Sequence, residues 1–575
     1  MAKWAGRVIR ATLQGKLVLV ALALGVALSA WAGEPRYFAI RHARIVPVSG
    51  PEIKSGTVVI AKGLIVAVGE NVSIPPEAWV IEGKGLTVYP GFINALSDLG
   101  LGPPAPAGPG GVGGGAGRGQ PQQAQQVSHG PEDRPASTPW INAADELKPD
   151  DKRVETWRNG GFTSALAAPM TGIFPGQGAV VNLAGERPSE MVVAAPSALL
   201  ITLQPARGFG NFPDSLMGVI AYVHQVFLDA NWYNQAQPIY HSHPQGLERP
   251  AYDRTEIVVN DTLVSGRPVL VPANTAQEMH RVLALGHELG ALTVIYGGQQ
   301  GYEDADELAA AKVPVLVNLK WPEREKDADP EAEEPLRVLR FRDRAPSAPA
   351  ALQKAGVKFA FYFEGTGVPK DALKNAKKAI DAGLPADAAL RAFTLNAADI
   401  LGVGDRLGSI EPGKIANLVV TDGDPFNEKT KVKMTFVDGR RYEVHEPGRP
   451  TAPPTVKLTG KWKISLTSPQ GPEEAMADLS MAADGTLSGS LTGVSGAMLA
   501  SVGTVSISEG WVSGNQFSFT LSLTLGGSPT DVIFSGTLEG EQMKGTASGG
   551  GMSVDFTGTR AAGAAPAVNA GQEVE

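Results

Sequence analysis

The chain has 575 residues, a formal net charge of −9 and no cysteine. The absence of cysteine excludes disulfides, thiolate catalysis, iron–sulfur clusters and cysteine-ligated zinc. The acidic balance, without a cluster of Lys and Arg, argues against a nucleic-acid partner and against anionic surfaces. At about 100–200 residues per domain, the length predicts roughly two to four domains.

The first 32 residues have the layout of a secretory signal peptide. A positive region at residues 3–16 precedes an apolar run at 17–28 (LVLVALALGVAL) and an A-x-A cleavage signal that ends at Ala32. The apolar run is short for a membrane span, so an uncleaved anchor is the weaker alternative. We therefore expect an exported protein, periplasmic or extracellular, with no stable membrane insertion after signal cleavage.

Short β segments at residues 33–85 and 405–450 flank a long region of different character. Both segments alternate β-rich runs with Gly and Pro turns, and we expect them to pair into one small composite β-sandwich domain. Residues 102–130 are rich in Gly, Pro and Gln and almost free of large apolar residues, which predicts a disordered insert.

Residues 86–404 alternate continuous apolar runs with helical patterns. The candidate strands are the run that ends at 96 and residues 162–168, 198–203, 268–273, 291–297, 313–319 and 357–363. Such runs, each followed by a helix, indicate a parallel sheet buried on both faces, and their number predicts a (β/α)8 TIM-like barrel. An open doubly wound sheet is the alternative, weakened because no G-x-G-x-x-G follows a strand there.

The sequence pattern changes after a linker at residues 451–456. Residues 457–560 show about eight alternating strands with Gly, Asn and Asp turns and no helical pattern. This pattern predicts an all-β module, either a lipocalin-like up-and-down barrel or a sandwich. The tail at 561–575 is predicted to be disordered.

Several segments carry motifs typical of one enzyme family. They are residues 88–100 (VYPGFINALSDLG), 160–169 (GGFTSALAAP), 394–405 (TLNAADILGVGD), 406–426 (RLGSIEPGKIANLVVTDGDPF) and 436–442 (FVDGRRY). The first resembles the PGxIDxHxH signature of the amidohydrolase superfamily. The last two resemble the C-terminal signature of its imidazolonepropionase-like and dihydroorotase-like members. The resemblance covers residues 37–445.

The resemblance implies a metal-dependent barrel hydrolase that acts on non-peptide C–N bonds of the cyclic amide type. Members hold zinc or another divalent ion through an HxH after the first strand, later histidines, often a carboxylated lysine, and an aspartate after the last strand. The ion lowers the pKa of a bound water and polarises the scissile carbonyl.

This chain departs from that pattern where the ligands should stand. The alignment places Asn94 at the family's Asp, Leu96 at the first His and Asp98 at the second. The turn after the last strand reads Gly365-Thr366-Gly367 and has no aspartate. Since leucine has no electron pair for a metal, the sequence predicts that the ligands are lost, with no metal and no cofactor.

The eight histidines support the same prediction without the family. Catalytic groups of a (β/α)8 barrel lie at the carboxyl ends of the strands, and no histidine falls there. They lie instead in the terminal β segments (His42, His445), the insert (His129), helical patterns (His224, and His280 with His287 on one helix face), and a Pro-rich loop (His241, His243). We interpret the helical pair as helix-surface or interface residues and the HxH as a polar loop.

The polar residues near the expected strand ends are the candidates for a cleft. They are Asp98, Glu364, Lys320, Asn94 and Tyr296. Some of them also have a structural interpretation: Asp98 could cap the next turn, and Lys320 could pair with Glu323 or Glu325.

Three functions remain open from the sequence. The first is a hydrolase with an unusual site that includes Asp98 and Glu364. The second, which the loss of ligands favours, is an inactive pseudoenzyme that binds a small molecule or a partner. The third is a structural exported protein. The sequence predicts no particular oligomeric state.

Overall fold

The computed structural model describes residues 37–101, 134–205, 212–324, 333–364, 368–444, 453–468, 471–482, 485–495, 504–525, 528–549 and 552–561. The predicted signal peptide, the insert at 102–130, the start of the linker and nearly all of the tail lie outside these residues. Two compact units divide at Val444 and His445. Among the described helices, none combines the length and the apolar character that a membrane crossing requires.

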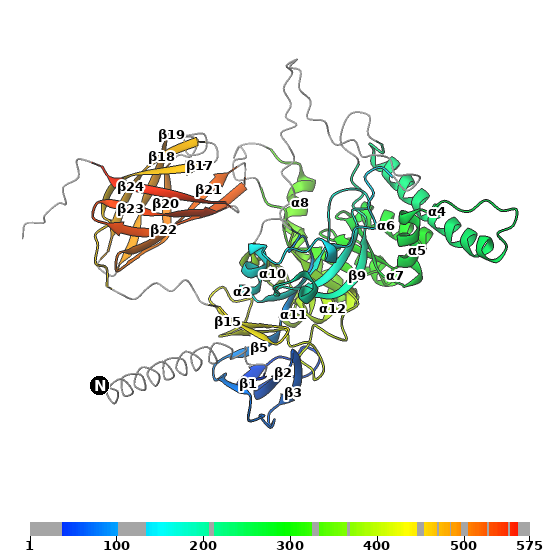
Figure 1. Ribbon diagram of the computed structural model, residues 1–575, viewed down its shortest axis with the longest axis horizontal. Coiled ribbons are helices and arrows are strands. Elements are labelled where there is room, and N and C mark those ends of the chain that lie inside the picture. Colours follow the sequence, from blue (N-terminus) through cyan, green and yellow to red (C-terminus); the bar gives the residue numbers. More distant parts are fainter. Residues whose placement is uncertain are drawn as a thin grey trace, which may run out of the picture. The chain divides into compact units, whose positions relative to one another are not determined.

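One sheet of the first unit joins strands from both of its ends (Figure 1). Its strands are β1 (Tyr37–Ile45), β2 (Ile53–Ala61), β3 (Leu64–Gly69), β4 (Trp79–Glu82), β5 (Thr87–Pro90), β14 (Leu418–Thr421), β15 (Val432–Val437) and β16 (Arg440–Glu443). β5 pairs antiparallel with β14 and thereby links the two ends. The composite sheet was predicted, but it also takes in β5, which the sequence had placed with the central region.

A second, central sheet has eight strands that follow one another in sequence order. They are β6 (Phe92–Ser97), β7 (Phe162–Ala167), β8 (Gln177–Asn182), β9 (Val192–Leu200), β10 (Val269–Ala273), β11 (Thr293–Gly297), β12 (Val315–Asn318) and β13 (Phe359–Tyr362). All seven predicted strands are present. β6 pairs parallel with β7, and every pairing from β9 to β13 is also parallel.

The eighth strand was missed, and it breaks the predicted parallel order. β8 pairs antiparallel with both β7 and β9. The segment between β7 and β8, PMTGIFPG at 169–176, is too short and too rich in Pro and Gly for the helical crossover that a parallel strand needs. An antiparallel return is therefore the arrangement that this connection allows.

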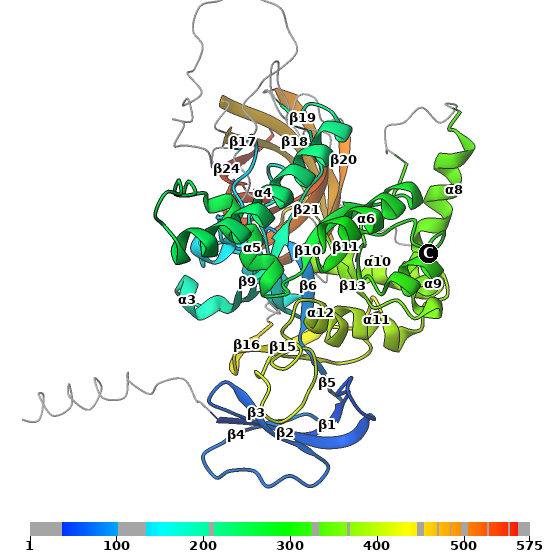
Figure 2. The same ribbon diagram turned by 90° about the vertical axis from the view of Figure 1, so that its right-hand side faces the viewer.

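Helices cover the outside of the central sheet, and Figure 2 shows α6 and α9–α12 around its strands. The α-helices are α2 (Lys152–Asn159), α3 (Pro188–Met191), α4 (Leu216–Ser242), α5 (Arg254–Val264), α6 (Ala276–Leu289), α7 (Ala305–Ala311), α8 (Leu336–Arg344), α9 (Ala348–Ala355), α10 (Pro369–Asp381), α11 (Ala386–Phe393) and α12 (Leu395–Ile400). Short 3₁₀ turns lie at η1 (Ala143–Asp145) and η2 (Ala345–Ser347).

The two faces of the central sheet pack in separate apolar layers. In β12, for example, Val315 and Val317 join the outer layer against the helices, whereas Leu316 joins an inner cluster. This alternation follows from the two-residue period of a strand. At the amino ends of the strands, α12 closes the inner cluster: Asn396 Nδ2 donates to Phe359 O at 3.1 Å.

The second unit is a closed antiparallel barrel. Its strands are β17 (Gly460–Ser468), β18 (Gly471–Met481), β19 (Thr486–Ser495), β20 (Thr504–Ser513), β21 (Gln516–Leu525), β22 (Ser528–Glu539), β23 (Gln542–Gly549) and β24 (Met552–Arg560). Each strand pairs with the next, and β17 closes on β24. The up-and-down barrel was one of the two predicted architectures, and the sandwich was wrong.

Candidate functional site

The two positions at the end of β6 where the family places its histidines face different surroundings. Leu96 is 1% exposed and belongs to the inner apolar cluster. Asp98 faces Arg153 of α2, whose Nη1 donates to both carboxylate oxygens at 3.0 Å. The side chain of Asp98 is therefore held in an ion pair and does not cap the next turn, which was the alternative expectation.

Arg153 also contacts a second carboxylate, that of Asp151 at the start of its own helix, α2. Its Nη2 donates to Asp151 Oδ2 at 2.8 Å, and Asp151 caps the start of α2. Burial alone would raise the pKa of Asp151, but the hydrogen bonds from Arg153 outweigh burial and lower that pKa. The Asp98–Arg153–Asp151 group is a structural ion-pair network.

Asn94 joins the first and last strands of the central sheet. β6 and β13 are in contact, but no backbone ladder pairs them, although both strands are fully described. Asn94 Nδ2 donates to Phe363 O at 3.4 Å, and Phe363 N donates to Asn94 Oδ1 at 3.2 Å. The side-chain amide thus takes the place of the peptide group of a neighbouring strand, because it offers one donor and one acceptor.

Polar side chains gather where β12 and β13 end. Asn318 Nδ2 donates to Glu364 Oε2 at 3.0 Å, and Asn318 Oδ1 accepts from Lys320 N at 2.9 Å. Gln299 Nε2 donates to Lys320 O at 2.7 Å. Within the described residues, Glu323 pairs with Lys378 at 2.8 Å, so the expected pair between Lys320 and Glu323 is wrong. Glu325 lies outside the described residues.

Two tyrosines fill the space inside these strand ends. Tyr296 and Tyr362 are buried in the inner cluster with their rings 6.4 Å apart, and Tyr296 Oη donates to Ile201 O at 3.1 Å. Burial, then the nearby charge of Glu364, raises the pKa of both phenols. Both tyrosines therefore stay neutral, and they occupy the interior as packed side chains.

A cavity of about 270 Å³ opens beside the carboxyl ends of β9 and β10. Its lining is Thr202, Leu203, Pro205, Leu216, Pro272, Ala273, Asn274, Glu278, Arg281 and Val282. The carboxylate of Glu278 is engaged with the backbone N–H groups of Asn274 and Thr275 at the start of α6. No described acidic side chain forms an ion pair with Arg281, which shares the cavity with the carboxylate of Glu278.

The histidines among the described residues lie away from the strand ends. His42 pairs with Glu82 and His224 with Glu288, whereas His129 and His445 lie outside the described residues. His241 lies in the last turn of α4 and His243 is its C-cap, so the predicted Pro-rich loop is wrong: α4 continues through Pro238 to Ser242. His280 and His287 are both exposed on α6, as interpreted, and His280 also contacts two carboxylates.

Four of the five predicted cleft residues lie near the ends of β11–β13, whereas Asp98, which directly follows β6, lies apart against Arg153 of α2. None of the five is hydrogen-bonded to another. Asn318 links Lys320 to Glu364, and sequence reasoning overlooked it. A signal was available, because Asn318 is the polar residue in the apolar run VLVNL and marks the actual end of β12. Arg153 and Arg281 had no comparable signal.

Comparisons with known proteins agree with the fold. A model of the amidohydrolase family matches residues 308–442. The N-substituted formamide deformylase of Arthrobacter pascens is 42% identical over 85 residues, or 14% of this chain and 16% of that protein. The amidohydrolase tasK of Hapsidospora irregularis is 42% identical over 64 residues, or 11% of this chain and 6% of that protein. The matches thus span a small part of either relative.

A solved structure matches over a longer range. The amidohydrolase from Thermotoga maritima MSB8 superposes with a TM-score of 0.58 at 25% identity, over 71% of this chain and all of that one (100%). The chain therefore belongs to the amidohydrolase superfamily.

Proposed function

We propose that this chain keeps the amidohydrolase fold, a (β/α)8-type barrel joined at Asn94, and no longer hydrolyses its substrate with a metal at the strand ends. The observation that carries the proposal concerns the two expected ligand positions at the end of β6: Leu96 is packed in the inner apolar cluster, and Asp98 is held by Arg153. A catalytic zinc needs three protein ligands and an open position. The residues at these strand ends do not fit that requirement.

The proposed activity is binding of a small carboxylate in the cavity beside β9 and β10. Arg281 supplies a guanidinium that forms no ion pair with a described acid, and leucine, proline and valine side chains supply an apolar wall. Arginine binds carboxylates through its planar, forked donor groups. The ligand class is therefore a small acid with an apolar body.

Ligand binding is tested with a thermal-shift screen of short apolar carboxylic acids and their matched amides on the full-length chain. We expect acids, but not amides, to raise the melting temperature, and Arg281→Gln to abolish the shift. Arg340→Gln, an exposed arginine on α8, is the control. Equal shifts from acids and amides, or an unchanged shift in Arg281→Gln, would exclude this site.

A second candidate is hydrolysis of a C–N bond, which superfamily membership and the deformylase relative favour. Its base would be Glu364, an exposed carboxylate at the strand ends beside Asn318. The assay is hydrolysis of N-substituted formamides, cyclic amides and dipeptides with zinc or manganese added. We expect no turnover. Turnover that Glu364→Gln or Asp98→Asn abolishes would establish the hydrolase instead.

Export is also part of the proposal, and it rests on the signal-like residues 1–32. The mass of the mature protein, purified from its native cell, tests it directly. A chain that begins after Ala32 supports export, and a full-length chain in the cytoplasm contradicts it.

A further inference from the structure

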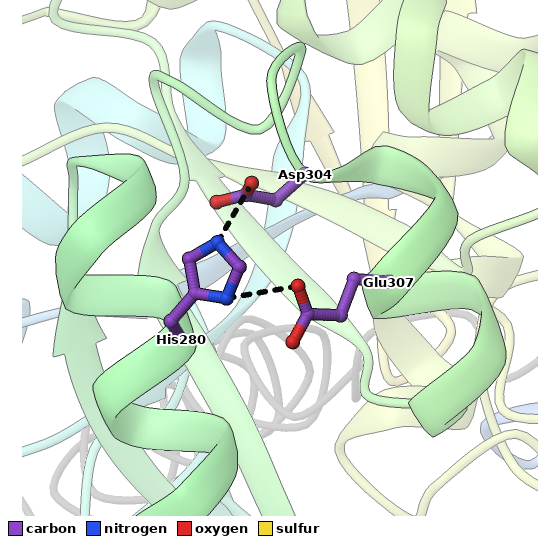
Figure 3. Close-up of side chains that lie close together, drawn as sticks. All are labelled: His280, Asp304 and Glu307. Carbon is purple, nitrogen blue, oxygen red and sulfur yellow. Dashed lines mark ion pairs between the residues drawn. The ribbon is translucent and has the colours of Figure 1, made fainter.

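A compact group of metal-ligating side chains lies outside the strand-end site. His280 is on α6, Asp304 immediately precedes α7, and Glu307 is in its first turn (Figure 3). His280 Nε2 lies 3.2 Å from Asp304 Oδ1, and His280 Nδ1 lies 2.8 Å from Glu307 Oε2. One ligand atom from each residue can be chosen so that all three lie within 4.8 Å of one another.

The carboxylate of Asp304 is left incompletely satisfied in a buried position. Its side chain is only 10% exposed, and Oδ2 has no hydrogen-bond partner although it is shielded from solvent. Asp304 is the N-cap residue of α7, yet its side chain makes no capping hydrogen bond and turns toward His280 instead. An aspartate that gives up its usual capping bond and keeps a buried, unpaired oxygen indicates a missing partner at this point.

The local charge points to a cation as that partner. Two carboxylates face one imidazole, and no described Lys or Arg pairs with Asp304 or Glu307. Imidazole nitrogen with carboxylate oxygen is a donor set that zinc and similar divalent ions accept. Bonds of about 2.0–2.2 Å separate tetrahedral donors by about 3.3 Å. The two ring nitrogens of His280 each contact a different carboxylate, so the imidazole must turn to present one nitrogen to the ion. The side chains of His280 and Glu307 are half exposed.

We propose that His280, Asp304 and Glu307 bind one zinc-like divalent cation, with water completing the coordination. One ring nitrogen of His280 and one oxygen of each carboxylate are the protein ligands. This site is separate from the strand ends, and it stands whether or not the chain hydrolyses a substrate.

The cation would fix the loop that leads from β11 to α7. Gln299 of this loop donates to the backbone oxygens of Asn318 and Lys320, and Gln300 accepts from Ala276 N at the start of α6. A metal between α6 and α7 therefore holds the loop that supports the ends of β12. Its role is structural, since all three ligands come from the helices and their start.

The test uses the full-length chain, stripped with EDTA and titrated with zinc against a chromophoric chelator. We expect one bound zinc per chain and slower amide exchange in residues 298–311 when zinc is present. His280→Gln, Asp304→Asn and Glu307→Gln should each weaken binding by at least about tenfold. His287→Gln, an exposed histidine on the same helix, should bind like the parent.

Two results would overturn the proposal. One is zinc binding that is unchanged in Asp304→Asn and Glu307→Gln. The other is the absence of zinc binding by the folded parent chain. Far-UV circular dichroism of each variant confirms that it is folded.

Discussion

A buried charge cluster between α4 and α5 yields an unusual prediction about stability. Arg134 Nη1 donates to Asp229 at 2.9 Å, and its Nη2 donates to Asp253 at 3.2 Å and to Glu256 at 3.0 Å. One guanidinium thus faces three carboxylates. The side chain of Glu256 is only 9% exposed, so water does little to stabilise its charge.

Glu256 is a member of the cluster whose protonated form is favoured by its surroundings. Asp253 also accepts the backbone N–H groups of Thr255 and Glu256, and Asp229 also accepts from Gln225. Burial, followed by the charge of Asp253, raises the pKa of Glu256 from its ordinary 4.5 to about 7, although Arg134 opposes the shift. At 1.36 kcal/mol per pKa unit, this shift corresponds to about 3 kcal/mol.

The raised pKa of Glu256 determines whether stability increases or decreases with pH. Below pH 4.5 the protonated Glu256 contributes its full share of stability, and that share is lost as the pH rises through about 7. Glu256→Gln imitates the protonated form and does not titrate. We therefore expect the free energy of unfolding of Glu256→Gln, relative to the parent, to increase by up to about 3 kcal/mol between about pH 5 and pH 8.

Urea titrations followed at 222 nm measure this difference, because every described helix belongs to the first unit. Glu155→Gln, an exposed glutamate on α2, is the control and should show no such trend. A Glu256→Gln variant that is less stable than the parent at pH 8 would refute the reasoning. It would show that the ion pair with Arg134 outweighs the excess negative charge.

Three further predictions concern single contacts. Asn94→Leu leaves the buried N–H and C=O of Phe363 unsatisfied and should cost about 2–5 kcal/mol in urea unfolding; an unchanged stability would contradict the joining role of Asn94. Tyr296→Phe removes the bond to Ile201 O and should cost about 1–2 kcal/mol at pH 7, with no effect on zinc binding; a loss of zinc would contradict a purely structural Tyr296. Phe534→Ala removes one aromatic side chain from the core of the second unit and should lower the free energy of unfolding by about 3–5 kcal/mol. The loss should be seen only in the unfolding transition of the β-barrel. A loss below about 1 kcal/mol would contradict the packed position of Phe534.

Much of the architecture was readable from the sequence because it rests on short-range periodicity. Apolar runs located all seven predicted strands of the central sheet, and two-residue alternation located the strands of the second unit. Strand β8, which the sequence pattern did not predict, shows the limit of predicting strands from periodicity. Its sequence, QGAVVN, is short and weakly patterned, and its direction depends on how the chain returns from β7.

Local sequence also identified Leu96 and Asp98 at the positions where ligands were expected, because a motif aligns residues that are close in the chain. Tertiary structure alone decided what those positions and their neighbours contact. Asn94 meets Phe363 and Asp98 meets Arg153 because the sheet brings distant strands and helices together. The group of His280, Asp304 and Glu307 likewise exists because α6 and α7 follow adjacent strands, and no spacing within either helix predicts it.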